Sequence, residues 1–277
     1  MPLNFFLYII GWHKIDQAYF PSKGMFYPHN TTFQIKAAGS KEIRQYSAIN
    51  EEDPFSIEES LNNILITCFS VDYDGRVGSW KDLLEEDRIF IILAIRDLTF
   101  AKGENKLTFK VNCTECDHEN EFEVRNGSFD YKSISEKLTK YYDSDRSVLA
   151  IRTKDFGNFD ITPPTVGVMH EVTKYIKEKT QNRRKIDQSF VKILPYLVQE
   201  WRGLNQTAIK NLEIEYMGWS PEKFNFMFDL VEMVQVSVKE EMIKPCEKCS
   251  AEVAAPVQFP GGLKSLFVVS DISGQLL

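Results

Sequence analysis

The sequence lacks the short motifs that mark the common catalytic and nucleotide-binding sites. It contains no glycine-rich phosphate loop, no G-x-G-x-x-G fingerprint, no G-x-S-x-G nucleophile turn and no H-E-x-x-H metal motif. Histidine is scarce, with four residues scattered at positions 13, 29, 118 and 170. These absences count against an enzyme of a familiar type and favour a structural or protein-binding role.

A surplus of basic residues is also missing, since the 277 residues carry a formal net charge of −7. Nucleic acid is therefore not expected as the main partner, because neutralising phosphates requires a basic surface. The length allows one large or two small domains. The contents of 43% hydrophobic and 26% charged residues are typical of a soluble globular protein with a core of ordinary size.

No apolar run is long enough for a membrane helix. The strongest, residues 3–10, is too short to cross a bilayer. It also lacks the preceding basic residue and the following small-residue cleavage pattern of an export signal. We interpret this run as a buried strand or a packing arm, with an uncleaved membrane-seeking segment as the alternative. Membrane binding is therefore not expected.

Cysteine is scarce, but four of the five cysteines form two C-x2-C pairs, Cys113 with Cys116 and Cys246 with Cys249. The first pair lies between two segments of alternating apolar and polar residues, 107–111 and 121–124, which read as a hairpin. A tight turn that directs two thiolates to one point is a zinc knuckle, and two knuckles supply the four ligands of a tetrahedral structural zinc site. Four-cysteine ribbons usually place their second pair about 15–20 residues after the first. Here Cys246 follows Cys113 by 133 positions, so a zinc ion shared by both pairs would close a very long loop.

Other uses of these cysteines are less favoured. An odd number of clustered cysteines fits a reducing compartment and metal or redox chemistry better than a disulfide framework. A redox-active pair would need a strand-to-helix junction, where the helix dipole lowers the thiol pKa. His118 could also be a ligand, but the second pair already completes the set. Cys68 lies in an apolar run and is expected to be a small buried residue.

Apolar periodicity predicts a mainly helical core with short β-hairpins. The predicted helices cover residues 55–69, 80–98, 165–175, 190–201, 207–217 and 221–238, and the predicted hairpins cover residues 31–49 and 148–161. Residues 89–95 are apolar nearly all round, so their helix is expected at the centre of the core. The charges before it, Asp87 and Arg88, are expected to pair with each other or at the helix ends.

Two further segments stand out. In residues 20–28, two prolines bracket a Ser22-Lys23-Gly24 turn, which predicts a rigid loop with a structural rather than a docking role. The chain also ends in an apolar tail after Pro260. If one zinc ion bound by both knuckles ties the two halves of the chain together, the interaction surfaces are expected elsewhere. This loop and this tail are then the candidate interaction surfaces.

The order of these features resembles the baseplate protein family of large contractile-tailed (T-even-like) bacteriophages, whose members act in forming the baseplate hub. The resemblance extends over about residues 18–277. It rests on Pro21-Ser22-Lys23-Gly24 with Tyr27-Pro28, the helix with Asp87-Arg88 and Arg96, the first knuckle, Pro164-Thr165-Val166-Gly167, and the closing knuckle with its tail. Such knuckles usually read Cys-Pro-x-Cys-Gly. Here Thr114 and Glu247 replace the proline, and Asp117 and Ser250 replace the glycine, while the ligands are kept.

We therefore expect an α+β protein with a mainly helical core, short β-hairpins and a split four-cysteine zinc ribbon. The N-terminal half, residues 1–127, would hold the core helices and the first knuckle, and the mostly helical C-terminal half, residues 128–277, would hold the second knuckle and the tail. The resemblance implies a non-enzymatic role with other baseplate hub proteins as partners and no small-molecule substrate. The protein would be either a hub subunit in the virion tail or an assembly chaperone in the host cytoplasm. The alternatives are a zinc-ribbon nucleic-acid-associated factor and a CxxC thiol oxidoreductase.

Overall fold

The computed structural model describes residues 11–101, 106–198, 200–239 and 241–268, and these residues form an α+β fold as predicted. The α-helices are α2 (Ser40–Tyr46), α3 (Pro54–Cys68), α4 (Glu85–Thr99), α5 (Glu136–Thr139), α6 (Val166–Gln181), α7 (Gln188–Leu197), α8 (Gln206–Met217) and α9 (Pro221–Val234). Short 3-10 helices cover Gln17–Tyr19, Trp80–Asp82 and Leu263–Leu266. The apolar run at residues 3–10, predicted to be a strand or packing arm, lies outside the described residues.

The strands form small antiparallel sheets. One sheet has the order β1-β2-β3-β4, one has the order β10-β9-β8, and three are two-stranded, β11-β7, β12-β13 and β5-β6. Their bounds are β1 (His13–Ile15), β2 (Thr31–Ile35), β3 (Phe69–Tyr73), β4 (Arg76–Val77), β5 (Leu107–Asn112), β6 (Glu119–Val124), β7 (Tyr131–Lys132), β8 (Tyr142–Asp143), β9 (Val148–Thr153), β10 (Gly157–Ile161), β11 (Ser237–Val238), β12 (Glu241–Pro245) and β13 (Glu252–Pro256). The hairpin predicted over residues 148–161 is therefore present as β9 and β10.

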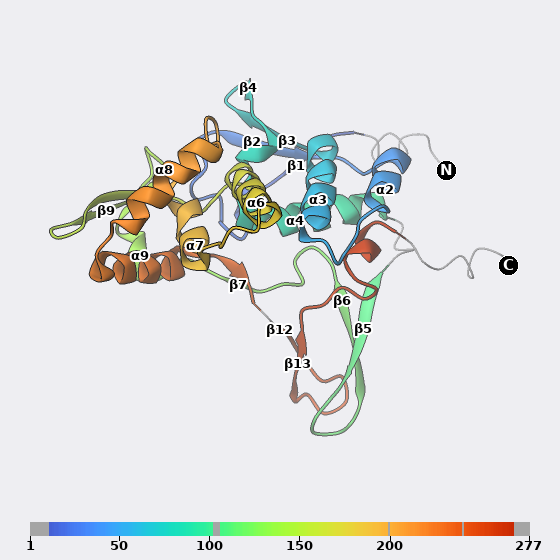
Figure 1. Cartoon of the computed structure of the whole chain (residues 1–277). Helices are drawn as coiled ribbons and strands as arrows, with labels where there is room; N and C mark the ends of the chain where they lie inside the picture. The colour runs from blue at the N-terminus through green and yellow to red at the C-terminus, as the bar shows by residue number, and fades with distance from the viewer. Residues whose placement is uncertain (1–10, 102–105, 199, 240, 269–277) are drawn as a thin grey trace.

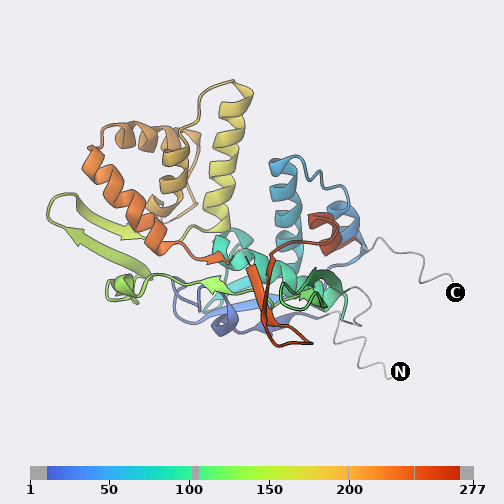
Figure 2. The same cartoon turned by 90° about the horizontal axis from the view of Figure 1, so that it is seen from below.

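Figure 1 shows a body from which the hairpins β5-β6 and β12-β13 project together as an arm. In Figure 2 the yellow-to-orange helices α6 to α9 group on one side of the body, and the blue helices α2 and α3 stand on the other. None of the helices in the described part of the chain combines the length and the apolarity needed to span a bilayer.

Helix α4 forms the centre of the core, as its composition predicted. Ile91, Ile92, Leu93 and Ile95 are completely buried, and the helix is packed against α3, α6 and β2. The helix begins later than predicted, because a separate 3-10 helix occupies the predicted first turn. Ser79 caps the 3-10 helix Trp80–Asp82, and the chain is extended at Leu84 before α4 begins at Glu85.

Asp87 and Arg88 do not pair with each other. Both are instead paired at the start of the helix, which is the other arrangement that the prediction allowed. The carboxylate of Asp87 accepts hydrogen bonds from the backbone and hydroxyl of Ser22, at 2.9 and 2.7 Å, and from the hydroxyl of Tyr27 at 2.7 Å. Arg88 instead contacts Glu58 on α3 at 2.7 Å and also reaches Glu85. Adjacent residues on a helix point in different directions, so each charge finds its partner on a different neighbouring element.

These bonds hold the loop of residues 20–28 in the core. Phe20, Ser22, Phe26 and Tyr27 are buried, and Tyr27 also accepts a hydrogen bond from the backbone of Leu84 at 3.0 Å. The structural interpretation of this loop is therefore the right one. The expectation that it offers an interaction surface is wrong for these buried side chains.

The described part of the apolar tail is also packed inside. Leu266 and Phe267 are buried, and the ring of Phe267 lies 5.0 Å from that of Tyr46 on α2. The hydroxyl of Tyr46 donates to the carbonyl of Leu263 at 2.9 Å. The described part of the tail packs against its own chain. The prediction that the tail is a docking surface is therefore wrong for residues up to 268.

The hairpin predicted over residues 31–49 is wrong in its second half, which forms helix α2. Gly39 is extended at the N-cap, and its backbone N–H donates to the carboxylate of Glu42 at 2.9 Å. Ile43 and Tyr46 are three positions apart, which is a helical spacing that the β-branched content concealed. Strand β2 pairs with β1 and β3 instead.

The buried apolar residues form two clusters. The larger cluster contains α4 and includes residues from both predicted halves, such as Ile64 and Met227. The smaller cluster lies within the group of α6, α7 and α8 and consists of Val168, Val172, Tyr175, Phe190, Leu194, Leu204 and Ile209. The division of the chain at residues 127 and 128 stays a prediction.

Candidate metal centre

The two C-x2-C pairs lie at the turns of two separate hairpins, as expected. Cys113 and Cys116 lie between β5 and β6, and Cys246 and Cys249 lie between β12 and β13. Strand β13 packs beside β5, so both turns are at the same end of the arm (Figure 1). Neither pair lies at the start of a helix, where the helix dipole would lower the thiol pKa of a redox-active pair.

The two turns share one backbone conformation. In the first, the N–H of Cys113 donates to the carbonyl of His118, and the N–H of Asp117 donates back to Cys113, both at 2.9 Å. In the second, Cys246 donates to Ala251 at 2.7 Å and Ser250 donates to Cys246 at 2.9 Å. Asp117 and Ser250, which stand where such knuckles usually have glycine, adopt the left-handed region with φ of 55° and 61°. The knuckle backbone is therefore formed without glycine, and Asp tolerates this region better than most residues.

This backbone brings the four sulfur atoms together. All four lie within 4.8 Å of one another, and no other His, Asp or Glu of the described residues joins the group. The Sγ atoms of Cys113 and Cys249 are 3.6 Å apart, and those of Cys116 and Cys246 are 3.7 Å apart. Sulfur atoms bound at about 2.3 Å to a tetrahedral centre are separated by about 3.8 Å. The residues therefore fit one tetrahedral thiolate-bound metal, and His118 is not part of the set.

Asn120 on β6 connects the two hairpins. It is fully buried. Its amide nitrogen donates to the carbonyl of His118 at 2.8 Å and to the Sγ of Cys246 at 3.7 Å, and its amide oxygen accepts from the backbone of Glu247 at 3.1 Å. Such outer contacts fix the orientation of metal ligands. Sequence patterns do not reveal Asn120, because a polar residue in a hairpin carries no signal of its own.

The surroundings of Cys246 favour its thiolate. Burial opposes the charge, but the backbone N–H groups of Cys249 and Lys248 and the amide of Asn120 outweigh this effect, and the pKa of the Cys246 thiol falls to about 6. Thiolates are the form in which cysteine binds metals. The pKa of the Cys249 thiol is instead raised to about 12, with the neighbouring cysteine sulfurs among the causes. The preparation of the site for a cation therefore rests on its geometry.

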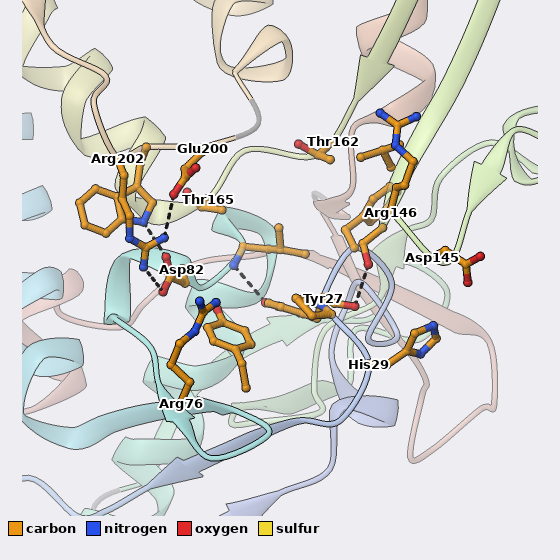
Figure 3. A pocket seen from close by; sticks show the side chains of 17 residues that line it. Tyr27, His29, Arg76, Asp82, Asp145, Arg146, Thr162, Thr165, Glu200 and Arg202 are labelled. Carbon is orange, nitrogen blue, oxygen red and sulfur yellow. Dashed lines mark hydrogen bonds and ion pairs between the residues drawn. The ribbon is translucent and has the colours of Figure 1, made fainter.

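A pocket of about 430 Å³ is a second candidate site (Figure 3). It lies where residues 26–29, Arg76, residues 145–148 and residues 200–202 converge, and Thr165 lines its wall. Tyr27-Pro28 and Thr165 belong to motifs on which the family resemblance rested. The pocket therefore brings together segments of this pattern that are far apart in the sequence.

The polar groups of this pocket mostly bind each other. Arg202 contacts Asp82 at 3.0 Å and Glu200 at 3.2 Å. The hydroxyl of Ser147 donates to the backbone carbonyl of Tyr27 at 3.0 Å, and in Figure 3 the ring of His29 lies apart from this bond. No nucleophile and base are joined among the described lining residues. The arrangement is that of a packed junction between segments.

The protein has an α+β fold in which two hairpins far apart in sequence meet at one cysteine cluster. The chain belongs to the T4 bacteriophage base plate protein family, because the sequence model of that family matches residues 24–211. It is therefore a phage baseplate protein, and the predicted resemblance is confirmed. The match includes the first knuckle and ends before the second. Comparisons with curated proteins and with solved structures gave no match.

Proposed function

We propose that this protein is a non-enzymatic component in the formation of the baseplate hub, and that Cys113, Cys116, Cys246 and Cys249 together hold one structural zinc ion. The observation that supports zinc is the grouping of four sulfur atoms within 4.8 Å. Tetrahedral sites of four thiolates bind zinc or iron in proteins. Four cysteines from two C-x2-C knuckles are the ligand set of structural zinc ribbons, and they leave no open position for a reaction.

The proposed role of the zinc ion is to clasp the chain. It would join β5-β6 to β12-β13, whose ligands Cys116 and Cys246 are 130 positions apart. The projecting arm buries few residues beyond Phe122, Val124, Met242, Val253 and Ala255. A metal would therefore supply stability that such a small apolar interior does not.

Metal analysis of the purified full chain tests the zinc site. We expect one zinc per chain, and loss of the zinc in the Cys246→Ser variant. Cys68→Ala is the matched control, since Cys68 is buried away from the cluster, and it should keep one zinc. Two zinc ions per chain, none, or one iron would refute a single shared zinc site.

The hub role is supported by membership of the baseplate family and by the resemblance to proteins that form the hub. Mass spectrometry of purified tails, combined with deletion of the gene in the phage, tests it. A hub that fails to form without the protein supports the proposal. Presence of the protein in finished tails then indicates a hub subunit, and absence indicates an assembly chaperone. Normal hubs in the deletion phage would refute the role.

A further inference from the structure

A cavity of about 640 Å³ lies between the start of α4 and the helices α7 and α9. Strand β11 and the start of α6 complete its wall. Its lining is largely apolar and includes Ile89, Met169, Val191, Pro195, Tyr196, Val231, Val236 and Val238. We call this cavity the Glu86 socket, after the lining carboxyl group described next. Its volume lies in the range of sites that enclose a side chain or a small ligand.

Glu86, in the first turn of α4, brings an unusual group to this apolar wall. Its Oε1 atom is shielded from solvent and has no hydrogen-bond partner among the described residues. Burial raises the pKa of this carboxyl group well above its usual value, and the neighbouring Asp87 raises it further. Buried polar atoms are normally hydrogen-bonded, so an unpaired one points to a missing partner.

The other charged groups of the socket already have partners. Glu85 contacts Arg88 at 3.1 Å. Lys192 is paired with Glu232, and its ammonium group also lies 4.5 Å from the centre of the Phe228 ring. Neither group is placed to satisfy Glu86, which leaves the socket with one unpaired acidic group.

We propose that the Glu86 socket receives a lysine or arginine side chain from a neighbouring baseplate protein. The aliphatic stem of such a side chain would pack along Ile89 and Val231. Its cationic group would lower the raised pKa of Glu86, so that the carboxyl group loses its proton to solvent and binds the cation as a carboxylate. An acidic group at the base of an apolar socket selects a basic side chain over a purely apolar one, because an apolar occupant would leave the carboxyl group unpaired. That the donor is a baseplate protein rests on the proposed function, whereas the preference for a cation rests on the socket alone.

The socket can be tested with n-butylguanidinium as a probe for an arginine side chain. The probe is titrated into the full chain, and binding is followed by NMR shifts of the methyl groups of Ile89, Val191 and Val231. We expect saturable shifts at these methyls, and binding at least tenfold weaker in the Glu86→Gln variant. Glu215→Gln, which neutralises an exposed carboxylate on α8, is the matched control and should bind as the wild type does. Equal binding by Glu86→Gln, or equally tight binding of n-butanol by the wild type, would overturn the proposal.

A second variant guards against an indirect effect of Glu86→Gln on folding. Met169→Trp keeps Glu86 but adds volume at the wall of the socket. It should also weaken n-butylguanidinium binding at least tenfold while thermal unfolding shows a folded chain. Undiminished binding in a folded Met169→Trp variant would show that the probe binds elsewhere, and would overturn the proposal.

The partner can be tested in assembling baseplates with a photo-crosslinking residue at Gln188, which is exposed and lines the socket. A crosslinked baseplate peptide that loses its crosslink when one of its lysines or arginines is replaced supports the inference. A crosslinked peptide without a basic residue overturns it, and leaves the hub role intact. Failure of the hub role would instead appear as normal hubs in the deletion phage, whatever n-butylguanidinium does.

Discussion

The buried carboxyl group of Asp87 gives the protein a pH-dependent stability whose sign follows from the structure. Burial raises the pKa of Asp87 to about 6, although the hydrogen bonds from Ser22 and Tyr27 act in the opposite direction. In the unfolded chain the same group has a pKa near 3.9. Between these two values the folded state binds more protons than the unfolded state, so the free energy of unfolding falls as the pH rises.

The size of this effect can be worked out for the Asp87→Asn variant. A shift of one pKa unit corresponds to about 1.36 kcal/mol, so Asp87 contributes about 3 kcal/mol that is fully present below about pH 4 and lost above about pH 6. Over the practical window from pH 5 to pH 7.5 the same expression gives about 1.4 kcal/mol. The asparagine side chain of the variant does not titrate, and its amide oxygen can still accept from Ser22.

The assay is urea unfolding of the zinc-loaded wild type and Asp87→Asn at several pH values. The quantity of interest is the difference between their free energies of unfolding, in which the titration of the cysteine centre cancels. The titration of Glu86 also cancels in this difference, except for its repulsion with Asp87. That repulsion adds to the expected loss of stability with rising pH. We expect the wild type to lose about 1.4 kcal/mol relative to the variant between pH 5 and pH 7.5. A difference that is constant, or that grows in favour of the wild type as the pH rises, would refute the reasoning.

Three further predictions concern the clasp and one close contact. Chelation of the metal, or Cys246→Ser, should lower the melting temperature measured by calorimetry. The reason is that a cross-link closing a loop of 130 positions contributes about 5 kcal/mol when only the lost chain entropy of the unfolded state is counted. An unchanged transition would contradict the clasp. Asn120→Leu should weaken zinc affinity about 10- to 100-fold in competition with a chromophoric chelator, whereas Glu121→Leu, on the exposed next residue of the same strand, should not. Gly167→Ala should cost about 1–3 kcal/mol in urea unfolding, because the new Cβ would lie 2.5 Å from the Trp201 ring and 2.8 Å from Cβ of Lys81. Gly218→Ala is its control, since the nearest atom to its new Cβ would lie at an ordinary 3.4 Å; an equal loss in both variants would contradict the argument.

The parts of the fold that were predicted from sequence are those that local chemistry determines. The apolar segment 89–95 predicted a buried helix, and the C-x2-C spacing with its flanking alternation favoured knuckles in hairpins. Ser220, followed by Pro221, has the pattern of a helix cap, and it accepts a hydrogen bond from the third residue of helix α9. In these places a few neighbouring residues carry the whole signal.

Sequence reasoning stayed incomplete where the deciding partner is distant in sequence. It left open whether Asp87 pairs with Arg88 or at the helix end, and it could not name the hydrogen-bond partners Ser22 and Tyr27, about 60 residues earlier. Whether the two cysteine pairs share one site was open, because no local pattern joins positions 130 apart. The Glu86 socket combines α4, α6, α7, α9 and β11, so no stretch of sequence could have revealed it.

The contact of Tyr46 with Leu263 spans 217 positions and brings the start of the chain against its last described element. A ribosome adds about 5–20 residues per second, so about 10–45 s pass between the synthesis of the two residues. During that time α2 lacks the cover of Leu266 and Phe267, and the first knuckle lacks the second. Truncation by about 20 residues would remove little chain but would leave an apolar face of α2 exposed, with the aggregation risk that such faces carry. The order of synthesis thus leaves these surfaces uncovered until residues 263–267 have been made.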